Sequence, residues 1–398
     1  MSDKQRNSFI RGAIFLMATS SIGPAFLTQT AVFTQELLAS FAFAILASIV
    51  IDIGAQMNIW RVISVSGMRG QDIAGGVLPG LGLFVAILMV FGGFAFNIGN
   101  VAGAGLGLNA LFGIPVLLGS TITAAIAIIL FLIKDAMRIV DRIIQVLGII
   151  MIVMVGYVMF STSPPVQEAL VKAVLPDNFT SLLLPIVTLV GGTVGGYISF
   201  AGGHRLVDAG ITGKENVKFV SRAANLGILT TSAIRIFLFL AVLGVVTMGY
   251  TLDGDNPAAT VFQVALGDLG YKIFGLVLFS AAISSVIGCA YTSISFLRSF
   301  HSFFDRYNNW IIAGFIALST IVFVALGRPV ALLIIAGSLN ALILPIVLTT
   351  VLIASRKKSI VGDYHHPTWL IVFGAIAVLV TIIAGYISLG GIAELWNG

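Results

Sequence analysis

Charged residues are scarce in this chain of 398 residues, where Asp, Glu, Lys and Arg together make up 9%. Water-soluble domains carry about 25%. A soluble globule could not bury the 58% of residues that are hydrophobic. The composition therefore excludes a soluble protein and predicts an all-α membrane protein with many spans. The net charge of +5 would suggest nucleic acid only in a soluble chain, so no nucleic-acid partner is expected.

Cysteine, nucleotide-binding motifs and long loops are also lacking. The single cysteine, Cys289, excludes an intrachain disulfide. No segment follows the phosphate-binding pattern G-x-x-x-x-G-K-[ST], so ATP is not expected to drive the protein. The longest loop, Thr162 to Ser181, is too short for a soluble domain, and the N-terminal stretch lacks a cleavage site typical of a removable signal peptide. These absences favour a solute carrier over an enzyme or a receptor.

What is present is a series of apolar segments. A helix needs roughly 20 apolar residues to cross a bilayer, and that length predicts eleven spans. They are Phe9–Ser40, Phe41–Ser64, Leu78–Gly105, Phe112–Lys134, Val140–Ser161, Leu182–Gly203, Phe219–Tyr250, Tyr271–Phe300, Trp310–Leu326, Val330–Ala354 and Thr368–Ser388.

Positive charge is unevenly divided between the expected loops. With the N-terminus in the cytoplasm, most of the 21 Lys and Arg residues fall on cytoplasmic segments, and only Lys172, Lys272 and Arg328 fall on the other side. Cytoplasmic loops are the ones enriched in Lys and Arg. We therefore expect a cytoplasmic N-terminus in an integral protein of a prokaryotic cytoplasmic membrane.

Two expected spans carry groups that membrane helices usually avoid. The first contains "SSIGPAFLTQT" and the sixth contains "VGGTVGGYISFAGG", Val190 to Gly203. Glycine costs about 1 kcal/mol relative to alanine inside a helix, and unwound backbone is tolerated in a membrane only where it lines a cavity. Carriers with inverted repeats bind substrate between two discontinuous helices. We expect helices one and six to be broken at a substrate site, with close packing through small residues as the alternative.

Several stretches resemble the Nramp family of divalent-metal carriers, and the resemblance covers nearly the whole chain. They are "GPAFL" in the first helix, "QDIAGG" after the second, "NVAGAGLGLNALFGIP" from Asn100 to Pro115, "GGTV" from Gly191 to Val194, and "AAISSVIGCAYTSISF" in the eighth helix. The resemblance implies a LeuT-type core of ten helices in two inverted five-helix repeats, residues 9–161 and 182–354, within a single transmembrane domain, 1–398. The segment 368–388 is then an extra eleventh helix.

The family's metal ligands do not recur in this chain. The family's first-helix motif Asp-Pro-Gly-Asn falls on Leu27 to Thr30 when aligned from the second helix, the register we prefer, or on Thr34 to Leu37 when aligned from "GPAFL". Its Met-Pro-His motif falls on Gly195 to Tyr197, which removes a thioether that suits transition metals. Its tenth-helix glutamine falls near Gly337, and its two third-helix carboxylates fall on Asn97 and Asn100. No protein metal ligand is expected.

The replacements favour an organic substrate. Glycine in place of methionine opens volume beside backbone N–H groups, and half-helix N-termini suit carboxylates. Transporters of this fold bind amino acids in that way. We expect a small organic anion or amino-acid-like substrate, such as a lactam acid. The expected binding residues are Thr28, Gln29, Thr30, Gly192, Thr193, Gly195 and Gly196, with Tyr197 and Ser199 closing the pocket.

Two charged residues lie near the middle of expected spans, Asp52 in helix two and Arg235 in helix seven. Ionisable groups at that depth are costly and usually functional. The two helices are equivalents in the two repeats, so the side chains can meet. Three roles stay open: Arg235 as a counter-ion for an anionic substrate, Asp52 as the titrating group for proton coupling, or a purely structural ion pair.

The coupling ion remains open at this point. Asn97 and Asn100 can hydrogen-bond between helices but cannot titrate, which argues against the family's usual proton route. Sodium could use carbonyls of the broken helices and the hydroxyls of Ser284 and Ser285. Either H⁺ or Na⁺ is therefore expected as the coupling ion, and no other cofactor.

The sequence thus predicts a secondary transporter rather than an enzyme, acting as a monomer on a small molecule by alternating access. One rival is a Mg²⁺ or Mn²⁺ carrier with a looser, hydrated site. A second rival is a transport-inactive sensor or scaffold, which saturable uptake of any solute would exclude.

Overall fold

The computed structural model describes residues 12, 14, 21–133 and 136–397, and within this part every regular element is a helix. The longer helices are α2 (Pro24–Leu37), α3 (Phe41–Ser66), α5 (Leu81–Phe112), α6 (Val116–Leu132), α7 (Ala136–Ser161), α9 (Leu183–Thr193), α10 (Ile198–Asp208), α11 (Val217–Thr247), α12 (Pro257–Ser295), α14 (Asn308–Leu326), α15 (Pro329–Ala354) and α17 (Thr368–Asn397). The shorter ones are α4 (Gly70–Val77), α8 (Val166–Lys172), α13 (Ser302–Arg306) and α16 (Lys358–Val361).

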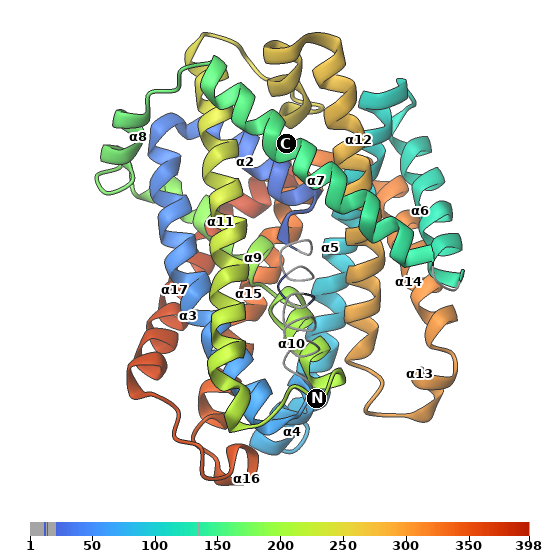
Figure 1. The fold of residues 1–398 in the computed structure, drawn as a ribbon, viewed down its shortest axis with the longest axis vertical. Helices are drawn as coiled ribbons and strands as arrows, with labels where there is room; N and C mark the ends of the chain where they lie inside the picture. The colour runs from blue at the N-terminus through green and yellow to red at the C-terminus, as the bar shows by residue number, and fades with distance from the viewer. Residues whose placement is uncertain (1–11, 13, 15–20, 134–135, 398) are drawn as a thin grey trace.

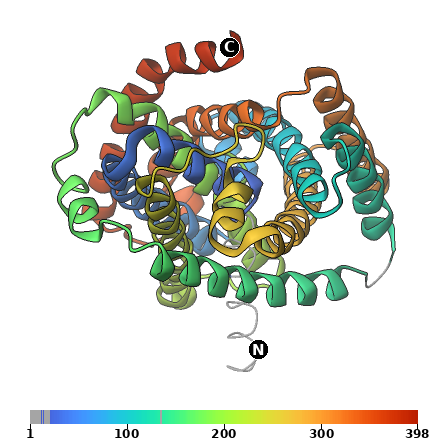
Figure 2. The same cartoon turned by 90° about the horizontal axis from the view of Figure 1, so that it is seen from above.

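Most of the long helices run along the long axis of the molecule, and α7 slants across one face (Figures 1 and 2). Within the described residues, eight helical segments are long and apolar enough to cross a membrane; α6 is shorter, and the end of α7 forms a pair with α8 that is bent by 103°. These segments make the chain an integral membrane protein. The count of eleven spans and the side on which the termini lie stay predictions.

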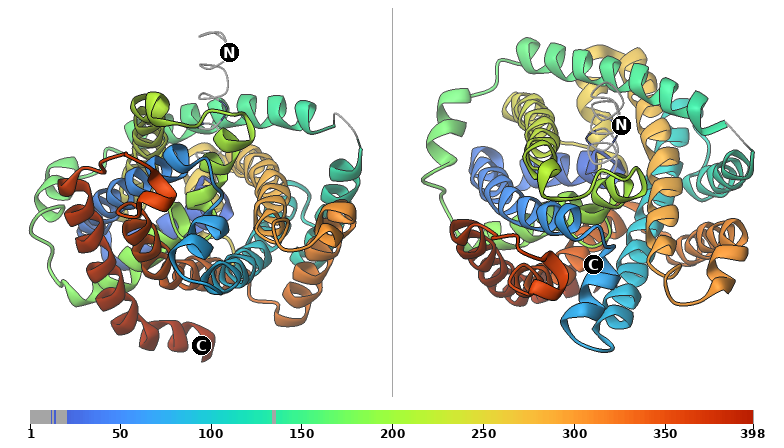
Figure 3. Two further views of the ribbon diagram at one scale, coloured as in Figure 1. Left: turned by 90° about the horizontal axis from the view of Figure 1, so that it is seen from below. Right: turned by 60° about the horizontal axis from the view of Figure 1, so that its bottom comes forward.

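The centre of the bundle is occupied by α9 and α10. In the most apolar 18-residue stretch of the segment Thr180–Asp208, which contains both, 89% is buried. In the corresponding stretches of α14 and of the segment Thr368–Leu395 of α17 only 39% is buried, which places these helices at the periphery. Seen from below, the neighbouring helices surround this central pair (Figure 3). A central position is what the polar and glycine-rich composition of the sixth span requires, because lipid cannot satisfy unwound backbone.

The expected break in the sixth span is confirmed. Helix α9 ends at Thr193 and α10 begins at Ile198. Gly196, between them, has a φ of +51°, which favours glycine, and a Cβ there would lie 1.9 Å from Asn340 Oδ1 on α15. Gly196 therefore serves both the turn between the two half-helices and the close packing against α15.

The expected position of the first break is wrong. The chain bends at Ile22–Gly23, and Leu27 to Thr30 lie inside the continuous helix α2, as do Thr34 to Leu37 of the other register. Pro24 explains this, because proline lacks an N–H and is tolerated at the first helical position but not in the interior. Its ring packs against Gly103 of α5, where a Cβ would lie 2.0 Å from Pro24 Cβ.

The loop before α17 is attached to α3 by a buried histidine. His366 Nε2 and Asn58 Oδ1 are 2.8 Å apart, and Asn58 Nδ2 donates to the carbonyl of Leu370 at 2.9 Å. Burial, helped by the charges of Arg61 and Arg356, lowers the pKa of His366 from 6.5 to about 4. The imidazole is therefore neutral in the folded protein at pH 7.

This attachment predicts a pH dependence of stability. In the unfolded chain His366 protonates below about 6.5, while the folded form resists protonation until about pH 4, so its stabilising contribution is complete above pH 6.5 and is lost as the pH falls through this window. In H366Q the fall in melting temperature between pH 7 and pH 4.5 should be smaller than in the wild type. H365Q, which changes the exposed neighbour, should retain the full fall; equal falls in both variants would contradict the assignment.

A second prediction concerns the contact between α9 and α15. A Cβ on Gly191 would lie 1.8 Å from the carbonyl oxygen of Gly337 and 2.7 Å from the backbone nitrogen of Ala341. Overpacking against backbone costs about 1–3 kcal/mol, so G191A should lower the melting temperature in detergent by several degrees. G314A is the control, because a Cβ there has open space around it; it should be neutral or slightly stabilising.

Candidate functional site

The two helix breaks touch each other. Ser21 immediately precedes the first break, and its Oγ donates a hydrogen bond of 3.1 Å to the carbonyl of Thr193. Thr193 is the last residue of α9 and immediately precedes the second break. The N-terminal end of α2, which begins at Pro24, has no capping side chain at Gly23. Free backbone N–H groups and the helix dipole make such an end favourable for a negative group.

A buried pair of opposite charges lies beside this contact. Arg235 of α11 donates from Nη1 to Thr193 Oγ1 at 3.0 Å, and Thr193 Oγ1 in turn donates to the Leu189 carbonyl at 2.7 Å. The Asp52 carboxylate of α3 lies close enough to Arg235 to attract it electrostatically. Asp52, Thr193 and Arg235, here called the charge bridge, are each at most 2% exposed. The prediction that the side chains of Asp52 and Arg235 come together agrees with this geometry.

Arg235 retains unused hydrogen-bonding capacity. Its guanidinium carbon lies 4.3 Å from the ring centre of Phe26 on α2. Within the described structure, Nε and Nη2 have no hydrogen-bond acceptor, and Asp52 Oδ1 has no donor. Leaving buried charged groups unpaired costs free energy. The guanidinium could therefore donate hydrogen bonds to a further anionic partner.

A cluster of neutral polar groups lies on the other side of the first break. A Cβ on Gly23 would lie 2.9 Å from Ser285 Oγ of α12 and 3.7 Å from Asn100 Oδ1 of α5. The Tyr197 hydroxyl, from the second break, approaches Asn100 and Cys289. Within the described structure, none of the Ser285, Asn100 and Tyr197 side-chain polar atoms has a hydrogen-bond partner that meets geometric criteria. We call Asn100, Tyr197 and Ser285 the polar cluster.

Gln29 joins three helices from inside α2. Its Nε2 donates to the Leu333 carbonyl of α15 at 2.9 Å, and its Oε1 has no donor within the described structure. A Cβ on Gly192 would lie 3.2 Å from that Oε1, and a Cβ on Gly337 would lie 2.6 Å from Nε2. The Gln29 side chain therefore lies beside Gly192 and Gly337, two positions that the sequence comparison with the Nramp family had pointed to. It projects from a continuous helix and not from unwound backbone.

The other predicted site residues are buried, and several are already hydrogen-bonded. Thr28 is 2% exposed, and Thr30 Oγ1 donates to the Phe26 carbonyl at 2.7 Å. Ser199 Oγ donates to the Val194 carbonyl, and the Ser199 carbonyl accepts from Trp60 Nε1 at 2.8 Å.

Two further predicted residues pack against neighbouring helices. A Cβ on Gly195 would lie 2.6 Å from the Cα of Gly191. Asn97 Nδ2 donates to Ser319 Oγ of α14 at 3.0 Å, so this side chain is directed away from the polar cluster.

Sequence reasoning missed three residues at the site. Ser21 and Phe26 were overlooked because the first break was placed too far along the chain. Asn340 of α15 donates from Nδ2 to the carbonyls of Gly92 and Ala336, both at 2.9 Å, and its Oδ1 faces Gly196. A lone asparagine in the apolar run around it was a usable signal.

A cavity of about 370 Å³ adjoins the first break. It lies between α7, α11 and α12, and its lining is mainly apolar; Ile22 belongs to it, as do Thr230, Ile234, Ser280 and Ser284. The cavity therefore reaches the first break, at Ile22, from the side of α7.

Comparisons with known proteins agree with this architecture. The family model described as "natural resistance-associated macrophage protein-like", Nramp, matches residues 14–390. The uncharacterised membrane protein YcsG of Bacillus subtilis is 56% identical over 391 residues, which cover 98% of this chain and 96% of that protein.

Two solved structures resemble the fold at low sequence identity. A mutant of the manganese transporter from Eremococcus coleocola has a TM-score of 0.75 at 14% identity, covering 100% of this chain and 90% of that chain. MhsT in complex with L-phenylalanine has a TM-score of 0.68 at 16% identity, covering 94% and 98%. The fold is thus of the LeuT type.

The charge bridge predicts energetic coupling between α3 and α11. Removing one partner of a buried pair typically costs about 3–5 kcal/mol, whereas removing both costs less than the sum. D52N and R235Q should each lower the melting temperature strongly, and the double variant should recover part of the loss. The exposed pair Arg69–Asp208, with a distance of 2.6 Å, provides the control cycle, for which little coupling is expected. Additive losses for D52N and R235Q would contradict the bridge.

Proposed function

We propose that this chain, which belongs to the Nramp family of membrane transporters, carries a small organic anion or amino-acid-like solute by alternating access, coupled to an ion. The observation that carries the proposal is Arg235. It is a buried cation at the contact between the two helix breaks, and two of its nitrogens lack a protein acceptor within the described residues.

A carboxylate suits this position better than a bare metal ion. The guanidinium presents parallel N–H donors that match the two oxygens of a carboxylate, and such charge-assisted pairs are strong. The N-terminus of α2 adds favourable dipole potential. A divalent cation would instead be repelled by Arg235, and the formal charges of Asp52 and Arg235 cancel each other, which leaves no net negative charge in the bridge to compensate for it.

The neutral groups would recognise the rest of the substrate. The polar cluster offers hydroxyl and amide groups that can donate or accept, and Gln29 offers a free carbonyl oxygen. In the proposed site the predicted residues Thr28, Gln29 and Thr30 lie on the α2 side. The backbone from Gly192 to Gly196 lies on the side of the second break, and Tyr197 and Ser199 close the pocket.

The charge bridge also suggests how transport is coupled. A substrate carboxylate on Arg235 would compete with Asp52 for the guanidinium charge. Asp52 released from that interaction could take up a proton, so the substrate and H⁺ would bind together. Sodium is the alternative coupling ion, held by Ser285 and by Asn100 Oδ1 beside Gly23.

A divalent-metal carrier remains the second candidate, and one observation favours it. The amide oxygens of Gln29, Asn100 and Asn340 lack hydrogen-bond donors within the described structure, and hard cations bind amide oxygens and water. The Eremococcus coleocola neighbour is named a manganese transporter, whereas MhsT was solved with an amino acid. The fold therefore accommodates both classes of substrate.

The test is a binding panel on the purified full-length protein in detergent, measured by thermal shift. Amino acids and small carboxylic acids, including lactam acids, would be compared with Mn²⁺, Mg²⁺ and Ca²⁺, each with and without Na⁺ and at two pH values. Binding raises stability by RT ln(1 + [L]/Kd), so a ligand at a hundredfold excess over its Kd is readily detected. Saturable stabilisation by an organic acid supports the proposal; stabilisation by divalent ions alone would overturn it.

N100D separates the two candidates by the sign of its effect. A new carboxylate in the polar cluster would repel an anionic substrate, with a loss of about tenfold or more in affinity at short range, whereas it would increase the affinity of a divalent cation. N97D is the matched control, because Asn97 lies on the same helix but bonds to Ser319 of α14. A tighter Kd for Mn²⁺ in N100D, with organic acids unaffected, would favour the metal carrier.

A further inference from the structure

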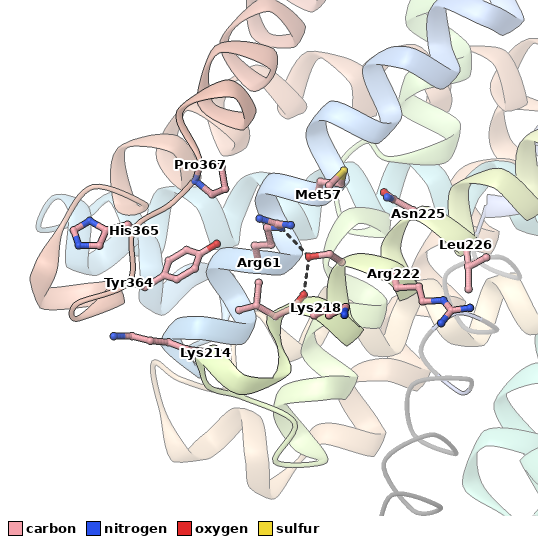
Figure 4. Close-up of a pocket in the computed structure, with 12 residues that line it drawn as sticks. Met57, Arg61, Lys214, Lys218, Arg222, Asn225, Leu226, Tyr364, His365 and Pro367 are labelled. Carbon is pink, nitrogen blue, oxygen red and sulfur yellow. Dashed lines mark hydrogen bonds between the residues drawn. The ribbon is translucent and has the colours of Figure 1, made fainter.

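A second cavity lies outside the transport site, at the end of the bundle where α4, α13 and α16 are found (Figure 1). This is the end predicted to face the cytoplasm. The cavity has a volume of about 650 Å³ and lies between α3, the start of α11 and the loop that leads into α17. Its lining includes four cations, Arg61, Lys214, Lys218 and Arg222, and no acidic residue among those described. We call it the basic pocket (Figure 4).

Arg61 forms the inner wall of the basic pocket. It is half-buried, and its Nε donates to Ser221 Oγ at 2.7 Å, while Ser221 Oγ donates to the Val217 carbonyl at 2.6 Å. The hydroxyl of Tyr364 is directed towards Arg61 (Figure 4), and this oxygen is buried without a hydrogen-bond partner within the described structure. A fixed guanidinium and an unpaired hydroxyl donor together favour a ligand with anionic oxygens.

Apolar side chains place the basic pocket at the surface of the bilayer. On α11, Leu226 lines the pocket and is 43% exposed, and Leu229 beyond it is 52% exposed. Trp369, at the start of α17, is 58% exposed. In a membrane protein such exposed leucines face acyl chains, and tryptophan prefers the level of the lipid headgroups. The pocket thus has cations on its aqueous side and an apolar wall on its membrane side.

We propose that the basic pocket binds the phosphate headgroup of an anionic phospholipid from the adjacent leaflet, with an acyl chain along Leu226 and Leu229. Basic pockets between transmembrane helices on the cytoplasmic side suit anionic headgroups, because Lys and Arg side chains near the membrane surface attract anionic lipids. The apolar wall is the reason to favour lipid over free phosphate, which would gain nothing from the leucines. The proposal does not depend on the identity of the transported solute.

A lipid in this place would connect three parts of the chain. Arg61 is on α3, Lys218 and Arg222 are on α11, and Tyr364 belongs to the loop before α17. Helices α3 and α11 are also the ones that carry Asp52 and Arg235. A headgroup held by the pocket would therefore link the same two helices at the membrane surface that the charge bridge links in the interior.

Native mass spectrometry of the purified full-length protein tests the proposal, with phosphatidylglycerol and phosphatidylcholine offered at equal concentration. The wild type should retain phosphatidylglycerol preferentially, and the double variant R61Q/K218Q should retain at least fivefold less of it. The control R306Q/K358Q removes two exposed cations from the same end but outside the pocket, and should behave as the wild type. Equal retention in the two double variants, or equal binding of both lipids, would overturn the proposal.

Melting temperatures measured with added ligand distinguish a lipid site from a site for a free anion. They also show whether each variant is folded. Phosphatidylglycerol should raise the melting temperature of the wild type, whereas inorganic phosphate at millimolar concentration should not; equal stabilisation by phosphate would show a free-anion site instead. If R61Q/K218Q has a lower melting temperature than the wild type in phosphatidylcholine alone, its fold is affected. The mass-spectrometry comparison is then made with the single variant R222Q, whose side chain is exposed. R222Q should then lose about half or more of the phosphatidylglycerol retained, and unchanged retention would contradict the site.

Discussion

The interactions at Thr193 and Arg235 join the two helix breaks to the buried charges. The Thr193 hydroxyl accepts from Arg235, which attracts Asp52, the Thr193 carbonyl accepts from the hydroxyl of Ser21, and α9 ends at Thr193. These contacts link α3, α11 and both helix breaks. Burying two opposite charges without geometric support is unfavourable. The arrangement of the surrounding helices, with α9 and α10 at the centre, provides the fixed geometry that the charge bridge needs.

The site combines neutral polar groups with one buried charge pair. Two helix breaks meet beside Asp52 and Arg235. On the other side of the first break, Asn100, Tyr197 and Ser285 have amide and hydroxyl groups that are unpaired within the described structure. Under the proposed function these neutral groups would discriminate by hydrogen bonding and shape, and Arg235 would supply the charge selectivity. Substrate class within one fold is decided by a few side chains, so fold similarity to a manganese transporter and to MhsT, solved with L-phenylalanine, does not identify the solute.

Much of the architecture could be predicted from the sequence because lipid imposes strict rules. The glycine density from Val190 to Gly203 located the second break, and the depth of Asp52 and Arg235 identified the buried pair. The first break was misplaced because the Thr-Gln-Thr cluster looked like a binding segment, whereas Thr30 bonds to its own helix and Pro24 determines where α2 begins. The role of Thr193 as a bridge could not be predicted, since it depends on the rotation of three helices about their own axes.

The close approach of α9 to α15 restricts how the protein can change shape. No side chain fits between Gly191 and the backbone of Gly337 and Ala341, so the two helices interlock. Sliding one along the other would require separating them first, so the contact resists relative movement of α9 and α15. Gly195 and Gly196 extend the same close packing to Asn340 of α15, so a rotation of α10 about this turn would also have to break that contact.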